Sequence, residues 1–91
     1  MGVLRSDYVY THAGLQRPVF LGGGKDVRYV LEVGDGEACV QVTYDPLEHV
    51  DRGRVRWETC DAVGGVYGVT GLRVLVRRVD GWCVLRVEEG F

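Results

Sequence analysis

The sequence predicts an all-β fold, either a small antiparallel barrel or a two-layer sandwich, with two Asp-Gly β-hairpins and one short helix. Three observations carry this prediction. Valine, whose branched side chain packs well on a pleated sheet, accounts for 18 of the 91 residues. Alanine, the residue that most favours helix, occurs only three times. Two Asp-Gly pairs each separate runs in which apolar and polar residues alternate, a pattern typical of hairpins.

The length of the chain predicts a single domain over residues 1–91, because 91 residues support one hydrophobic core and not two. No stretch has the roughly 20 consecutive apolar residues of a membrane-spanning helix, and the first residues do not have the pattern of an export signal. The three cysteines, Cys39, Cys60 and Cys83, are widely spaced. We therefore expect a cytoplasmic protein with reduced thiols and no membrane contact.

The N-terminal part is weakly patterned. Residues 8–10 are expected to form a short edge strand, and residues 18–21 form a second apolar cluster that a run of three glycines closes. Lys25 follows these glycines, but Asp26 stands where a phosphate-binding loop needs Ser or Thr, and a strand pattern follows in place of a helix. We interpret the run as a plain turn.

The first hairpin is predicted around Asp35-Gly36. With these two residues as the loop, Leu31 lies opposite Val40, and alternate residues of both strands share one apolar face. The members of that face are Val27, Tyr29, Leu31, Val33, Ala38, Val40, Val42 and Tyr44. A slip of one residue would mix this set with polar side chains, so the pattern predicts the register as well as the strands.

One short helix is predicted over residues 46–52. Asp45 is a suitable cap, Pro46 fits the first helical position, and Gly53 fits the left-handed stop. A further alternating strand is expected over residues 54–60, and Gly64 and Gly65 are expected to break the chain before a short strand over residues 66–69.

The second hairpin is predicted over residues 72–88 around Asp80-Gly81. One face is apolar and consists of Leu72, Val74, Val76, Cys83, Leu85 and Val87. The other face is mixed, with Leu75 beside Arg86 and with Arg77 and Trp82 nearby. A face of this kind is covered either by the N-terminal segment of the same chain or by another molecule.

The sequence contains no pattern that indicates catalysis or metal binding. The two histidines and three cysteines have none of the paired spacings of structural zinc sites, and nothing places His12 or His49 within reach of a thiol. We therefore expect no metal, no cofactor and no enzyme activity.

Charge differs between the two parts of the chain, although the net charge is only −2. Residues 1–51 carry four basic and eight acidic side chains, and residues 52–86 carry seven basic and three acidic ones. Arginines on a sheet with aromatic neighbours are typical of single-stranded nucleic-acid binding. The residues that would serve this alternative are Arg52, Arg54, Arg56, Arg73 and Arg77. The negative net charge counts against it, because phosphate binding is driven by cationic protein surfaces.

The function that the sequence favours is a non-catalytic protein-binding or assembly module that presents a sheet face or edge to a protein partner or to a second copy of itself. The mixed face supplies the candidate contact residues Leu75, Arg77, Trp82 and Arg86, because tryptophan and arginine are enriched among residues that carry interface energy. Burial of Trp82 in the core is the competing interpretation of that side chain. Nucleic-acid binding is the first alternative function, and a small enzyme or ligand-binding β-barrel is the second.

Overall fold

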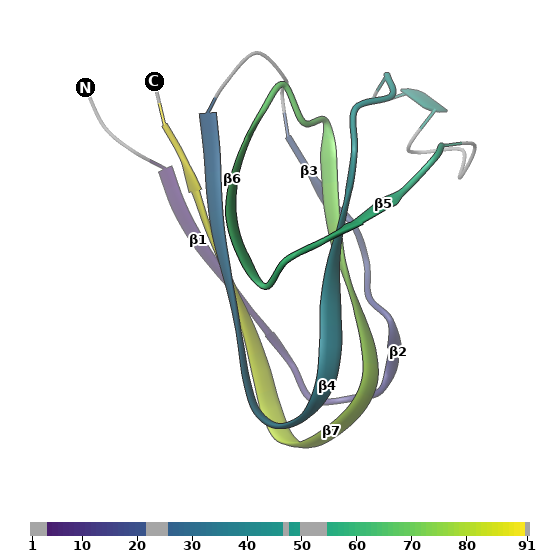
Figure 1. The fold of residues 1–91 in the computed structure, drawn as a ribbon, viewed down its shortest axis with the longest axis vertical. Coiled ribbons are helices and arrows are strands. Elements are labelled where there is room, and N and C mark those ends of the chain that lie inside the picture. Colours follow the sequence, from purple (N-terminus) through teal and green to yellow (C-terminus); the bar gives the residue numbers. More distant parts are fainter. Residues whose placement is uncertain (1–3, 22–25, 47, 50–54, 91) are drawn as a thin grey trace.

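The computed structural model describes residues 4–21, 26–46, 48–49 and 55–90, and this part of the chain is mostly strand (Figure 1). The strands are β1 (Leu4–Tyr10), β2 (Gly14–Leu15), β3 (Val19–Phe20), β4 (Asp26–Thr43), β5 (Glu58–Cys60), β6 (Val63–Tyr67) and β7 (Gly71–Glu89). All the pairings among them are antiparallel. The predicted all-β class is confirmed.

The two longest strands, β4 and β7, lie side by side along nearly their whole lengths. Val27 lies opposite Glu89 near one end of this pairing, and Thr43 lies opposite Gly71 at the other. Asp35 lies opposite Asp80 near the middle, where both strands bend back into the U shapes seen in Figure 1. Each long strand therefore has two arms: residues 26–33 and 38–43 in β4, and residues 71–76 and 83–89 in β7.

The shorter strands extend the two sets of arms separately. β1 and β6 flank the second arm of β7 and the first arm of β4, in the order β1, β7, β4, β6, and we call this the β1 half. β2 and β3 flank the first arm of β7, and β5 flanks the second arm of β4, which gives the β5 half. The result is a single seven-stranded sheet that folds over at the bends and is not closed into a barrel.

The predicted hairpin pairings are wrong, because other strands occupy both edges of each arm. Leu31 pairs with Leu85 on one edge, and its backbone N–H donates to the Ala62 carbonyl at 2.7 Å on the other. Val40 pairs with Val74 in β7 and with Cys60 in β5. The same holds for β7, whose first arm lies between β4 and β2–β3 and whose second arm lies between β4 and β1. Asp35-Gly36 and Asp80-Gly81 mark bends within strands and do not close hairpins.

The predicted apolar faces are nevertheless buried, because alternate residues of both arms point between the two halves. The fully or almost fully buried apolar residues are Leu21, Val27, Tyr29, Leu31, Val40, Val42, Val69, Leu72, Val74, Val76, Cys83, Leu85 and Val87. Val33 and Ala38 are partly buried against this core. Tyr44 is the exception, at 50% exposed, because β4 ends at Thr43 and the chain turns away there.

The set of β4 residues that point into the core changes from odd-numbered to even-numbered at the bend. Odd-numbered residues point inward in its first arm, and even-numbered residues do so in its second. Register shifts between β4 and β7 lie at the same bend, between Val33 and Asp35 and between Glu37 and Ala38, and at each of them β7 contains one more residue than β4.

The predicted helix falls mostly outside the described residues, which include only Pro46, Glu48 and His49 of residues 46–52. Glu48 and His49 are helical, and the His49 N–H donates to the Pro46 carbonyl at 2.9 Å. The Asp45 carboxylate accepts a hydrogen bond from the Arg56 backbone N–H, at 2.9 Å, which holds the start of this segment against the approach to β5. No helix in the described part of the chain is long and apolar enough to cross a membrane.

Candidate binding surface

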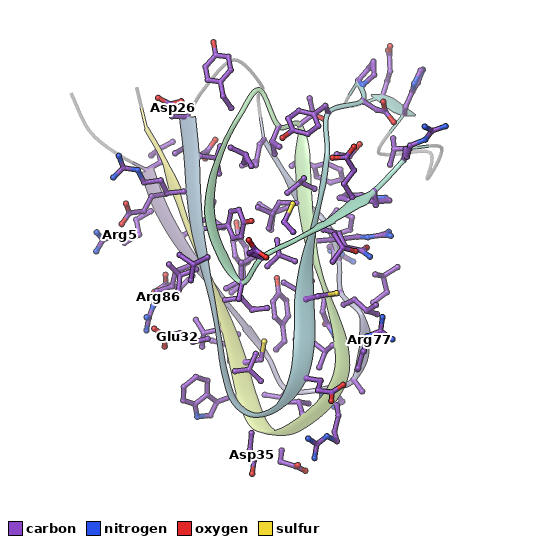
Figure 2. The ribbon with its side chains drawn as sticks, viewed as in Figure 1. Arg5, Asp26, Glu32, Asp35, Arg77 and Arg86 are labelled. Atoms are coloured by element: carbon purple, nitrogen blue, oxygen red, sulfur yellow. The ribbon has the colours of Figure 1, made fainter. Side chains whose placement is uncertain are left out.

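The four side chains predicted to form a contact surface do not lie together. Leu75 belongs to the β5 half, where it lies opposite Cys39 and Leu15, whereas Arg86 belongs to the β1 half, opposite Val30 and Asp7. Figure 2 shows Arg77 and Arg86 on opposite sides of the molecule. The predicted neighbourhood of Leu75 and Arg86 is therefore wrong, because it assumed that β7 pairs with itself.

Trp82 lies just beyond the bend of β7 and is 49% exposed. The described part of the N-terminal segment, from Leu4 onward, does not cover it as predicted for a core residue, because β1 and β2 pair along the edges of β7 and not over its outer face. The side chain is available to solvent, but Leu75 and Arg86 are not its neighbours.

The arginines of the nucleic-acid alternative are also dispersed. Arg73 is partly buried: its Nε donates to Gln41 Oε1 at 2.8 Å, and its guanidinium carbon lies 4.2 Å from the ring centroid of Trp57. Desolvation by burial lowers the pKa of Arg73. Arg56 and Arg77 are exposed, and Arg52 and Arg54 lie outside the described residues.

The outer face of the β1 half brings charged and apolar side chains into two adjacent rows across four strands. The first row, read from β1 to β6, is Arg5, Glu88, Arg28 and Gly65. The second row is Asp7, Arg86, Val30 and Val63. None of the predicted hairpin pairings gives this arrangement, because it depends on contacts between four separate segments of the chain.

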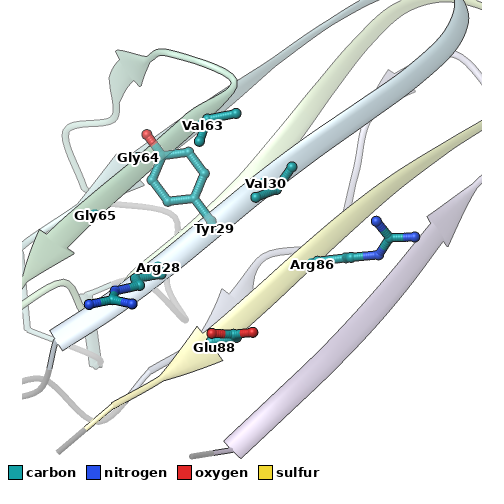
Figure 3. Close-up of a pocket in the computed structure, with 8 residues that line it drawn as sticks. All are labelled: Arg28, Tyr29, Val30, Val63, Gly64, Gly65, Arg86 and Glu88. Atoms are coloured by element: carbon teal, nitrogen blue, oxygen red, sulfur yellow. The ribbon is translucent and has the colours of Figure 1, made fainter.

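A pocket of about 330 Å³ opens on this face (Figure 3). Its lining residues are Arg28, Tyr29, Val30, Val63, Gly64, Gly65, Arg86 and Glu88. A second hollow of about 320 Å³ continues along β6, lined by Asp26, Val27, Arg28, Gly65, Val66 and Tyr67. Arg28 and Gly65 line both, so the two hollows are adjacent along β4 and β6, and we call them together the Arg28 groove.

Two adjacent glycines explain the hollow. Gly64 faces inward, where a Cβ atom would lie 2.7 Å from the Tyr29 hydroxyl oxygen, so the Tyr29 ring occupies the space of a side chain. Gly65 faces outward, and the nearest atom to a Cβ atom there would be 3.8 Å away. The expectation that these glycines break the chain is wrong: both lie inside β6, and Gly65 is a bare stretch of backbone beside the groove.

Charge on the groove is incompletely balanced. Arg86 forms an ion pair with Glu32, and Arg5 forms one with Glu88 at 2.8 Å. Arg28 and Asp26 are both exposed, and neither forms an ion pair within the described residues. A guanidinium in this position presents a planar set of donors suited to a carboxylate.

The β6 side of the groove is apolar and lies at an edge of the sheet. Val63 and Tyr67 are 63% and 65% exposed, and β6 contains no charged side chain. Within the described residues, β6 pairs only with β4. An uncharged edge strand of this kind is a surface on which another strand can pair.

The thiols and imidazoles are not gathered into a site. Cys83 lies in the core, where burial raises the pKa of its thiol, while Cys39 and Cys60 are partly buried and His12 and His49 are exposed. No group of three or more His, Cys, Asp or Glu side chains in the described part of the chain is placed to hold a metal ion.

Comparisons of the chain with protein-family models, with curated proteins and with solved structures found no match.

Proposed function

We propose that this chain is a non-catalytic protein-binding module that holds an extended segment of a partner protein along β6, with side chains of that segment in the Arg28 groove. The observation that carries the proposal is the coincidence of two features: an uncharged sheet edge that has no second partner strand among the described residues, and a groove that contains an exposed arginine. The proposal keeps Arg86 from the predicted contact residues and adds Arg28, Val63 and Tyr67.

The backbone of β6 supplies the first part of the binding. The Leu31 N–H donates to the Ala62 carbonyl, and bonded and non-bonded pairs alternate along an antiparallel ladder. Gly64 and Val66 therefore direct their backbone groups to β4. The N–H and C=O groups of Val63, Gly65 and Tyr67 point to the free edge, where an added strand would bond to them.

The side chains of the groove supply the chemical preference. An added strand lies two strand spacings from β4, roughly 10 Å. Gly65 has no side chain in this interval, so an acidic side chain of the added strand and the Arg28 guanidinium extend toward each other without obstruction. Apolar side chains of the added strand pack beside Val63 and Tyr67. The preferred partner is an extended segment that carries both acidic and apolar residues.

The test is a binding titration of the full chain with a short peptide in which valine and glutamate alternate. A peptide that alternates valine and lysine is the matched control. Arg28→Gln is expected to weaken binding of the acidic peptide by roughly tenfold, the value of one charge-assisted hydrogen-bonded contact. Gly65→Val is expected to weaken it by filling the groove. Arg77→Gln, on the opposite side of the molecule, is the control variant.

Equal binding of the two peptides, or binding that neither Arg28→Gln nor Gly65→Val weakens, would contradict the proposal. The same titration with a single-stranded oligonucleotide tests the alternative based on Arg56, Arg73 and Arg77. Peptide binding is better supported than nucleic-acid binding, because Arg73 already donates a hydrogen bond to Gln41 and contacts the Trp57 ring.

A further inference from the structure

The opposite edge of the β1 half is formed by β1, the outermost strand on that side in Figure 1. Within the described residues, β1 pairs with β7 and with no other strand. Its side chains alternate between a charged or exposed set, Arg5, Asp7 and Val9, and a partly buried set, Ser6, Tyr8 and Tyr10. This edge has seven residues and is longer than that of β6.

One hydrogen bond between β7 and β4 determines which residues of β1 direct their backbone groups to β7 and which direct them to the free edge. The Gly90 N–H donates to the Asp26 carbonyl at 2.7 Å, which fixes the alternation of bonds between β7 and β4. Glu88 and Arg86 then bond toward β4, while Val87 and Leu85 bond toward β1.

The partners of Val87 and Leu85 in β1 are Ser6 and Tyr8, so these two residues direct their backbone groups to β7. The backbone N–H and C=O groups of Arg5, Asp7 and Val9 therefore point to the free edge. The residues that carry the charged side chains are thus the ones whose backbone groups are open to an added strand.

We propose that a second copy of this chain pairs antiparallel with β1 about a two-fold axis at Ser6. In this arrangement Arg5 lies opposite the partner subunit's Asp7, and Asp7 lies opposite the partner subunit's Arg5. These are the positions with outward-pointing backbone groups, so each of the two pairs forms both of its backbone hydrogen bonds. The β1 halves of the two copies become one continuous sheet.

Charge selects this register over its neighbours. A shift of two residues in one direction places Arg5 opposite the partner's Arg5, and a shift in the other direction places Asp7 opposite the partner's Asp7. A shift of one residue places the charged face of one strand beside the inward face of the other. Pairing about Ser6 alone matches opposite charges and keeps inward-facing residues on the same side.

The pairing also covers groups that the single chain leaves exposed. Leu4 is 57% exposed and comes to lie opposite the partner subunit's Tyr8. Asp7 forms no ion pair within the described residues and gains an arginine. The Arg5 side chain is 71% exposed although it contacts Glu88, so its guanidinium can contact a second carboxylate. The contact is therefore complementary in both apolar and charged parts.

This inference goes beyond the proposed function, because it concerns a second copy of this chain and a different edge of the sheet. Sedimentation equilibrium on the full chain tests it. The unmodified chain is expected to form a dimer as its concentration rises. Arg5→Asp and Asp7→Arg are each expected to raise the dimer dissociation constant by roughly tenfold or more, because each places like charges together twice in the symmetric pair. The double variant with both changes restores opposite charges and is expected to dimerise like the unmodified chain.

Circular dichroism of each variant tests whether the chain remains folded. If one single variant is destabilised, the double variant still tests the charge pairing. Val63→Lys on the β6 edge is the control and is expected to leave the dimer intact. A chain that stays monomeric at millimolar concentration, a dimer unaffected by either charge reversal, or a dimer that only Val63→Lys disrupts would overturn the inference. The peptide titration in the Arg28 groove is read separately, so failure of one proposal is distinguishable from failure of the other.

Discussion

Gly36 lies against the backbone of Arg78 where the folded sheet bends, so closely that a Cβ atom on Gly36 would be 2.2 Å from the Arg78 carbonyl oxygen. The φ angle of Gly36 is +147°, a conformation that residues with side chains rarely adopt. Both facts follow from the crossing of β4 and β7 from one half of the sheet to the other at this point. The absence of a side chain at residue 36 is therefore a condition of the fold.

We expect Gly36→Ala to lower the free energy of unfolding by about 3 kcal/mol or more, because the new methyl group meets backbone atoms that cannot move independently. Gly34→Ala is the matched control: a Cβ atom there would lie 3.6 Å from the Trp82 carbonyl oxygen, an ordinary contact. Urea denaturation of both variants measures the difference. Equal stability of the two would show that β4 and β7 do not approach each other as described.

The sequence was sufficient to predict the strand-rich class and, with the exception of Tyr44, the inward-facing residues of β4 and β7. It was not sufficient to predict which strands pair. In a hairpin around Asp35-Gly36, Leu31 and Val40 share an apolar face; in the folded sheet, they share the core between the two halves. Alternation of apolar residues is the same in both cases, so local pattern cannot distinguish them.

The positive φ at Gly36 and Gly81 is likewise needed by both a hairpin turn and a bend. A type I′ turn also requires positive φ at the preceding aspartate, and no described residue other than glycine has it. The φ angle of the aspartate therefore distinguishes a bend from a hairpin turn, and the sequence does not reveal it.

The Arg28 groove was missed for a related reason. In the predicted first hairpin, Arg28 lies on the face opposite the apolar set, and Gly65 lies at a predicted chain break. Their proximity arises from the pairing of β4 with β6, and local alternation does not predict which separate strands pair. The local signal in the sequence is the pair of glycines between Val63 and Val66, in a segment that carries no charged residue.

The effect of replacing Trp82 on the free energy of unfolding tests whether this side chain belongs to the surface or to the core. Trp82 is 49% exposed, whereas Leu85, three residues along the same strand, is completely buried. We expect Trp82→Ala to change the free energy of unfolding by less than about 1 kcal/mol, and Leu85→Ala to lower it by about 2–5 kcal/mol. Thermal and urea unfolding measure both. If Trp82→Ala lowered the free energy of unfolding as much as Leu85→Ala, Trp82 would be a core residue.

Two tyrosines predict a loss of stability in alkaline solution. Burial, with smaller contributions from Tyr8 and Cys83, raises the pKa of Tyr10 to about 12. Burial also raises the pKa of Tyr29 to about 12, with a contribution from neighbouring Cys60. In the unfolded chain both hydroxyls ionise near their ordinary pKa of 10.0.

Because the unfolded state releases these protons at lower pH than the folded state, the stabilisation is complete below pH 10 and is lost as the pH rises from 10 to about 12. Urea denaturation at a series of pH values is expected to show this decline, and Tyr10→Phe is expected to make it shallower. Tyr67→Phe, at a residue that is 65% exposed, is the control. A decline with the same slope in Tyr10→Phe as in the unmodified chain would exclude Tyr10 as its source.

The contacts of Arg73 indicate that this side chain stabilises the fold and does not serve to bind a ligand. Its guanidinium lies 4.2 Å from the centre of the Trp57 ring and also donates to Gln41. We expect Arg73→Gln to lower the free energy of unfolding by about 1–2 kcal/mol, because it removes both a partly buried cation–π contact and a charge-assisted hydrogen bond. Arg77→Gln, at an exposed position four residues further along β7, is expected to change it by less than about 0.5 kcal/mol.

Urea denaturation of the two arginine variants measures this difference, and the fluorescence of Trp57 in a Trp82→Phe background reports whether its contact with the guanidinium has been lost. If Arg73→Gln left both stability and Trp57 fluorescence unchanged, the arginine would not be held by the ring, and its charge would again be available to an external anion. The nucleic-acid alternative would then regain the residue on which it most depends, since Arg73 is the only member of that set placed beside an aromatic ring within the described residues.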